Sequence, residues 1–201
     1  MGSICMKHLD VADASENSTA SPLTTQEIHL VNESWKVVTP HWKEICELAF
    51  ERSLSSYGVL RSFFRTENPE LGLPEVLNSS IIQNHTDNFK NLVERAIAAP
   101  SLVQKQLLEY GKIHYEYGVK EEYIKNLANN TKTEVCCYIE DSSDGKKTHR
   151  AWERVFTFLS DTLIRGMRRA EKENGSVEVS NEREKEMIDD LENNRSENNN
   201  N

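Results

Sequence analysis

Hydrophobic residues recur at helical spacing from about residue 24 to residue 169, and this regularity constrains the fold more than any other feature of the chain. Thr24 and Glu27 have the spacing of a helix-capping box, and a hydrophobic face follows them. Its members are Ile28, Val31, Trp35 and Val38. No run of four or more residues alternates between hydrophobic and polar as a strand would. The sequence therefore predicts an all-α domain.

Proline, glycine and polar residues divide this region into several predicted helices. The divisions fall at Pro40, residues 55–58, residues 68–74, Pro100, Gly118 and residues 141–147. The last strong helix is predicted to begin near Thr148 and to end after Arg169.

The two ends of the chain differ in composition from the predicted domain, which spans residues 21–170. Residues 1–20 are polar and predict a flexible arm, and residues 171–201 are rich in Asn and acidic residues and predict a disordered tail. The formal charge of the chain is -9, of which -6 lies in the tail and -2 in the N-terminal arm. An acidic chain of this kind is not expected to bind nucleic acid, because that surface is usually basic.

Two histidines lie within the hydrophobic faces of consecutive predicted helices. His85 shares a face with Phe89 and Leu92, and His114 follows Leu107 and Gly111. Helices that pack together can point both imidazoles into one crevice. Zinc would need more ligands than this pair supplies, whereas haem carries four nitrogen ligands of its own and needs only one or two axial ones. The pair therefore favours haem iron.

The order and spacing of these residues resemble the globin family over about residues 22–170. The 29-residue separation of His85 and His114 is similar to that of the distal and proximal globin histidines, and residues 107–119 resemble the proximal stretch. Phe63 stands 22 residues before His85, like the phenylalanine that wedges against haem in the family. Trp35 and the adjacent residues 151–152, Ala-Trp, resemble nematode-type intracellular globins.

The resemblance implies a globin fold around haem b, with His114 as the axial ligand and His85 over the opposite face of the haem. It also places Phe63, Phe89 and Val119 at the haem, where the bulk of Phe89 narrows the distal pocket. His85 is the candidate for a sixth ligand.

The function expected from this site is reversible binding of O2 or another diatomic gas, for transport or sensing, rather than enzymatic catalysis. The alternative left open is a redox globin, with both histidines on the iron, that exchanges electrons with a protein partner or signals at a membrane. A haem-free helical interaction module is a third alternative. The partners left open are an electron-transfer protein, a membrane surface and a second copy of the chain.

The sequence predicts a cytoplasmic location, because it has no signal peptide, no membrane-spanning run and no disulfide-type cysteine spacing. The first residues resemble an N-myristoylation signal at Gly2, and Cys5 offers a second acylation site, so association with the plasma membrane is left open.

The remaining histidines show no pattern of partners, and we expect them to face solvent. They are His8, His29, His41 and His149. Cys46 is expected to be a small buried hydrophobic residue.

Overall fold

The fold is described from a computed structural model, which describes residues 23–64, 72–139 and 144–198, with side chains described up to residue 175. All regular structure in these ranges is helical, which confirms the predicted all-α class. The helices are α1 (Thr25–Val38), η1 (Thr39–His41), α2 (Trp42–Ser56), η2 (Gly58–Phe63), α3 (Leu73–Leu77), α4 (Ser80–Ala98), α5 (Pro100–Glu116), α6 (Glu121–Cys137) and α7 (Gly145–Asn198). The predicted N-terminal arm, the acylation candidates Gly2 and Cys5, and His8 lie outside the described residues.

Local sequence signals set most of the helix ends. The predicted capping box at Thr24 is formed, with the Thr24 hydroxyl accepting from the Glu27 amide and the Glu27 carboxylate accepting from the Thr24 amide. Pro100 occupies the start of α5, where no amide hydrogen is needed. Gly118, at a φ of 75°, turns the chain after α5 in a conformation that glycine adopts without strain.

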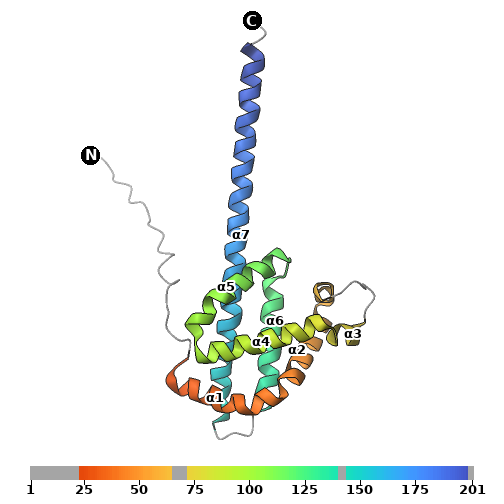
Figure 1. Ribbon diagram of the computed structural model, residues 1–201, viewed down its shortest axis with the longest axis vertical. Helices are drawn as coiled ribbons and strands as arrows, with labels where there is room; N and C mark the ends of the chain where they lie inside the picture. The colour runs from red at the N-terminus through yellow and green to blue at the C-terminus, as the bar shows by residue number, and fades with distance from the viewer. Residues whose placement is uncertain (1–22, 65–71, 140–143, 199–201) are drawn as a thin grey trace, which may run out of the picture.

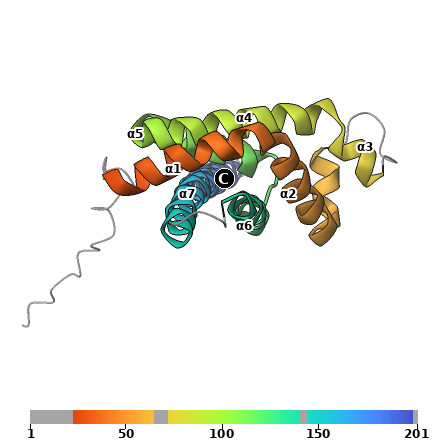
Figure 2. The same ribbon diagram turned by 90° about the horizontal axis from the view of Figure 1, so that it is seen from below.

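The helices cross in layers (Figures 1 and 2). The segments of α6 and α7 within the bundle lie alongside each other, and α4 crosses both at a steep angle. α5 lies across α7 and packs on it more extensively than on any other helix. This arrangement leaves α4 and α5 on one side of the α6–α7 layer, and a site between them can receive side chains from all four helices.

Three tryptophans join α1, α2 and α7 in the core. Trp35 contacts both Trp42 and Trp152, with ring centres 5.2 and 5.7 Å apart. Trp152 is fully buried, and its indole N–H donates to the Ser34 hydroxyl at 2.9 Å. The Trp42 indole N–H donates to the backbone carbonyl of Thr86 in α4 at 3.3 Å. The cluster therefore anchors the N-terminal helices to the first turns of α7.

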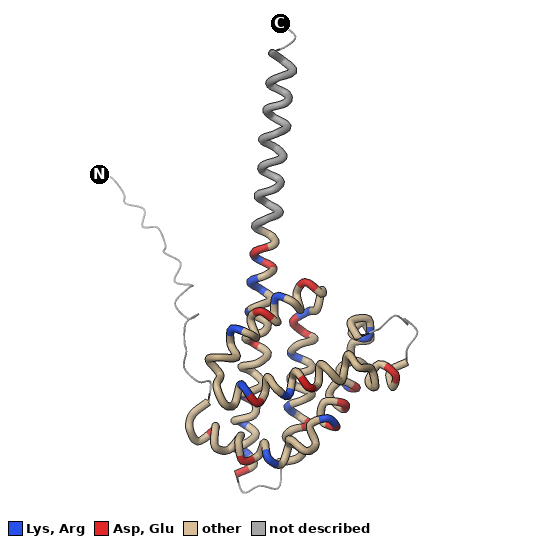
Figure 3. Tube along the Cα trace, viewed as in Figure 1, with Lys and Arg blue, Asp and Glu red and all other residues tan. Residues whose placement is uncertain are grey.

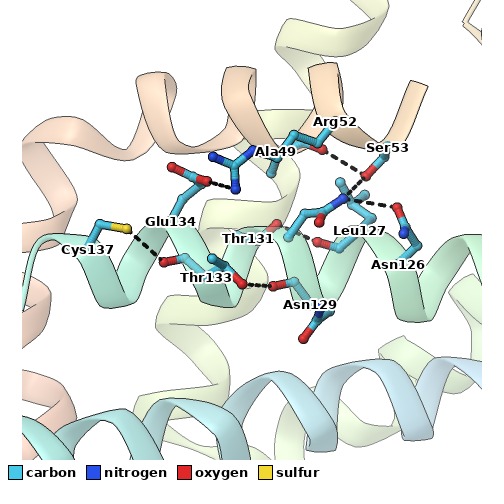
Figure 4. A network of polar contacts seen from close by, with 11 residues as sticks. Ala49, Arg52, Ser53, Asn126, Leu127, Asn129, Thr131, Thr133, Glu134 and Cys137 are labelled. Atoms are coloured by element: carbon cyan, nitrogen blue, oxygen red, sulfur yellow. Dashed lines mark hydrogen bonds and ion pairs between the residues drawn. The ribbon is translucent and has the colours of Figure 1, made fainter. Parts of the chain in front are cut away.

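Polar contacts join α2 to α6 (Figure 4). The carboxylate of Glu134, which is only 6% exposed, pairs with the guanidinium of Arg52. The Asn130 amide donates to the Ser53 hydroxyl at 2.9 Å, and that hydroxyl donates to the backbone of its own helix. A buried carboxylate without its partner would be costly, so these contacts fix the position of α2 against α6.

The last helix differs from its prediction at both ends. It begins at Gly145 rather than near Thr148, and it continues to Asn198 instead of ending after Arg169. Figure 1 shows this helix projecting well beyond the bundle. Extending an existing helix is cheap, because each added residue gains a hydrogen bond without a new nucleation step, and the Glu, Lys and Arg residues after position 169 favour helix.

Lys and Arg are interspersed with Asp and Glu over the helices of the bundle (Figure 3). Within the described ranges, no helix is long and apolar enough to cross a membrane.

Three of the histidines expected to face solvent lie within the described residues, namely His29, His41 and His149. His29 and His41 are exposed as predicted, and His41 stacks on Tyr138 with ring centres 4.6 Å apart. The prediction for His149 is wrong, because this side chain is half-buried and its enclosed Nε2 atom has no hydrogen-bond partner among the described residues. His149 lies in the first turns of α7 beside the buried residues Thr148, Ala151 and Trp152, so part of its ring is covered by the bundle. Cys46 is buried as predicted, and burial raises the pKa of its thiol.

Candidate functional site

The histidines from the two hydrophobic faces meet in the structure. His85 on α4 and His114 on α5 have ring centres 6.1 Å apart, with their planes inclined by 68°. They meet because each occupies the inward face of its helix and the two helices pack against each other.

The backbone of α5 fixes the orientation of the His114 ring. Nδ1 of His114 lies 2.7 Å from the backbone carbonyl oxygen of Tyr110, one turn earlier in the helix. Because a carbonyl oxygen only accepts, Nδ1 must carry the proton, and Nε2 of a neutral ring then holds a free lone pair. Burial lowers the pKa of His114, which keeps the ring neutral. His114 therefore has the tautomer that a metal-binding imidazole needs.

Aromatic rings surround His85. The rings of Phe50 and Phe64 lie edge-on to it, with centres 5.7 and 5.8 Å away. Burial, together with the charge interaction with His114, lowers the pKa of His85 to about 4. Among the described residues, none forms a hydrogen bond with the His85 ring, so its orientation rests on packing alone.

Two cavities meet at the histidine pair. One has a volume of about 250 Å³ and extends toward α7, and the other has a volume of about 530 Å³ and extends toward α2 and η2. Both are lined by His85, His114 and Leu127. Their walls are mainly hydrophobic, which suits a large flat apolar group better than a polar substrate.

The structure brings every predicted pocket residue to one of these cavities. Phe63 and Val119 line the larger cavity, and Phe89 lines the smaller one. The structure differs from the expectation at the phenylalanine next to His85, because the ring in contact with His85 is that of Phe64, while Phe63 forms part of the same wall. Phe63 ends η2 and Phe64 is the residue directly after it, so the two rings point in different directions, and the spacing alone did not distinguish them.

Sequence reasoning missed the contribution of α6 and most of that of α7. The floor of the cavities includes Ile124, Leu127, Ala128, Leu159 and Ser160. These positions carry no chemical signal, since apolar residues at helical spacing predict a buried face without showing which neighbour it meets.

The larger cavity opens at an apolar rim. Ile81, Ile113 and Tyr117 line this cavity and are 36%, 43% and 73% exposed. Within the described ranges, no three His, Cys, Asp or Glu side chains gather to hold a metal ion by themselves.

Comparisons with known proteins identify the fold. No protein-family model matches the chain, and no curated protein matches it significantly. Among solved structures, the chain is similar to a neuroglobin from the acoel Symsagittifera roscoffensis, with 13% identity, a TM-score of 0.60, and coverage of 72% of this chain and 99% of that one.

Two further structures show the same likeness. One is a hemoglobin from the botfly Gasterophilus intestinalis, with 15% identity, a TM-score of 0.57, and coverage of 72% of this chain and 99% of that one. The other is a hexacoordinated heme protein from an anhydrobiotic tardigrade, with 13% identity, a TM-score of 0.60, and coverage of 74% and 97%. The chain therefore has the globin fold, as expected, and the nematode-type resemblance stays a prediction.

Proposed function

We propose that this globin-fold chain binds haem b and that His114 is the axial ligand of the iron. The observation that carries the proposal is the bond between Nδ1 of His114 and the Tyr110 carbonyl, because it leaves Nε2 free to bind a metal. The lowered pKa of His114 supports the proposal further, because a neutral imidazole can bind a metal without first losing a proton.

The residues present fit haem in size and polarity as well. The two cavities flank the line between His85 and His114, so a flat group could lie between the imidazoles with its apolar edges in the hydrophobic walls. Phe63, Phe64 and Val119 are the wall residues available on the side of the larger cavity, and Phe89 is available on the other.

Haem iron held by one imidazole supplies reversible binding of O2 or another diatomic gas. The contribution of the chain is His85, whose ring faces His114, is neutral near pH 7 and therefore carries one N–H donor. Phe50 and Phe64 restrict that space and limit the water that reaches it.

The second candidate function is electron exchange by iron bound to both histidines. The distance between the imidazoles favours it: two nitrogens bound to one metal at about 2 Å each place their ring centres about 6 Å apart. The observed separation is 6.1 Å. One of the similar structures is also described as hexacoordinated, although at 13% identity that is a property of the tardigrade protein.

The absorption spectrum of the purified protein with added haem tests both candidates. We expect stoichiometric haem uptake with a Soret band, and no uptake would contradict the proposal. A five-coordinate ferrous spectrum without added ligand supports gas binding, and a six-coordinate low-spin spectrum supports electron exchange.

Acylation of Gly2 and Cys5 is a separate proposal, and it would place the second candidate at a membrane. The mass of the intact protein from cells tests it, with Gly2→Ala as the control. A mass with no added acyl chain would contradict it.

A further inference from the structure

A pair of glycines forms the point of contact between α5 and α7. Gly111 and Gly166 are both buried, and each lies against the backbone of the other helix. A Cβ atom placed on Gly111 would lie 2.0 Å from the carbonyl oxygen of Leu163, and one on Gly166 would lie 2.1 Å from that of Leu108.

The contact is reciprocal. Leu108 lies three residues before Gly111, and Leu163 lies three residues before Gly166, so each helix places the carbonyl of one turn over the glycine of the other. The atoms in contact are backbone atoms, which cannot rotate away as a side chain could. Separations below 3.0 Å essentially never occur for real Cβ atoms, so a methyl group at either glycine would push the helices apart by about 1 Å.

This contact lies in the same turn of α5 that holds His114. Gly111 directly follows Tyr110, whose carbonyl oxygen binds Nδ1 of His114, and it lies three residues before His114 itself. Residues three apart on a helix lie side by side on the same face, so Gly111 lies against α7 while His114 emerges directly beside it. A helix moves largely as a unit, and a shift at Gly111 would therefore be passed on to His114.

The distance between α5 and α7 also sets the width of the smaller cavity. Tyr110 and His114 form its α5 wall, and Leu159 and Leu163 form its α7 wall. Metal ligands must stay within about 0.5 Å of their productive position, which is less than the shift that one methyl group would cause.

We propose that Gly111 and Gly166 are positioning residues that hold His114 at the distance from His85 and from the cavity floor at which it can bind haem iron. The inference rests on the proposed function. It assigns the glycines a role in ligand placement in addition to helix packing.

The test compares Gly166→Ala with Gly175→Ala in haem-loaded, full-length protein. Both changes add one methyl group to α7 and raise its helix propensity by the same amount. They differ in their surroundings, because a Cβ at Gly175 meets no atom within 4 Å. We expect Gly166→Ala to change the axial-ligand bands of the ferrous spectrum and to raise the rate of haem transfer to an excess acceptor protein at least about tenfold. Gly175→Ala should match the wild type in both measurements.

A stability control separates placement from packing. Met167 is buried on α7 beside Gly111 and lines neither of the two cavities, so Met167→Ala loosens the same region without forcing the backbones apart. It should lower the melting temperature yet keep the wild-type ligand bands. If Gly166→Ala keeps those bands, or if Met167→Ala changes them equally, the positioning role is overturned. Failure of both Gly166→Ala and Gly111→Ala to fold would also overturn it, because the contact would then be required for the fold as a whole.

The outcome for the wild-type protein distinguishes this inference from the proposed function. If the wild type takes up no haem, the proposed function fails, and the glycine pair is then tested in the haem-free protein by the imidazole ¹⁵N shifts of His114. Those shifts should move in Gly166→Ala and stay unchanged in Gly175→Ala, and unchanged shifts in both would overturn the positioning role.

Discussion

The two halves of the histidine site are held in different ways. On the α5 side, backbone contacts define the position of His114: the Tyr110 carbonyl fixes its ring, and Gly111 fixes its helix against α7. On the α4 side, His85 lies among the rings of Phe50 and Phe64, and none of the described residues binds it through a hydrogen bond. Backbone contacts fix both the His114 ring and its helix, whereas the edge-on contacts of His85 include no hydrogen bond that holds its ring at one angle. The chain therefore has one fixed imidazole, His114, and one adjustable imidazole, His85.

Removal of the fixed imidazole should have the largest effect. We expect His114→Ala to weaken haem binding by more than about a hundredfold, because loss of a hydrogen-bond partner behind a ligand alone costs 10–100-fold. Equilibrium titration with haem measures it. His114→Gly with added imidazole is the control, since the free base should restore the spectrum, and full haem affinity in His114→Ala would contradict the assignment.

Acid should weaken the haem-free fold through the adjustable imidazole. In the unfolded chain His85 takes up a proton near pH 6.5, whereas in the folded chain its pKa is about 4. Since the unfolded state binds more protons between these values, the free energy of unfolding should fall as the pH falls from 6.5 to 4, by up to about 3 kcal/mol. The lowered pKa of His114 acts in the same direction.

Urea unfolding at a series of pH values measures this loss. His85→Leu is the control, because it lacks the titrating group and should show a shallower dependence on pH. An equally steep dependence in that variant would assign the loss to other groups.

Removal of the adjustable imidazole should leave haem bound but open the iron to ligands. If His85 competes for the sixth position, His85→Leu should raise the rate of CO association about tenfold or more. The reason is that a larger fraction of the molecules then has iron free to bind CO. Flash photolysis measures the rate. An unchanged rate together with faster O2 dissociation would instead assign His85 to stabilising bound gas, which is the first candidate function.

Removal of the Tyr110 hydroxyl, close to the fixed imidazole of His114, should have the smallest effect. The Tyr110 hydroxyl accepts from the Gln106 amide at 2.6 Å, whereas the bond to His114 uses the Tyr110 backbone. Tyr110→Phe should therefore cost about 1 kcal/mol of stability or less and leave the ligand bands unchanged. Thermal unfolding measures the stability, and the ferrous spectrum shows the ligand bands. Altered ligand bands would show that the Tyr110 side chain also holds His114.

The sequence allowed prediction of the helical class and of the two facing histidines, because both follow from spacing along one helix. A residue at a helical interval from its neighbours must share their face, and His85 and His114 each interrupt an otherwise hydrophobic face. The capping box at Thr24 was predictable for the same reason, since its partners lie three residues apart.

Features that depend on contact between distant segments could not be predicted. Gly111 was noted only as part of a motif, because its contact with Gly166 depends on how α5 crosses α7. The contact of Phe64 rather than Phe63 with His85 depends on the rotation of η2. The length of α7 was missed because the tail lacks a hydrophobic face, and a helix continued from a packed segment does not require one.

The tryptophan cluster gives the protein an internal optical reporter. The chain has three tryptophans, and all of them belong to this cluster. The rings of Phe89 and Phe156, which line the smaller cavity, contact Trp42 and Trp152. Any strongly coloured group that enters the cavity would therefore lie one ring away from Trp42 and Trp152 and two rings away from Trp35, and its arrival would quench the fluorescence of all three indoles.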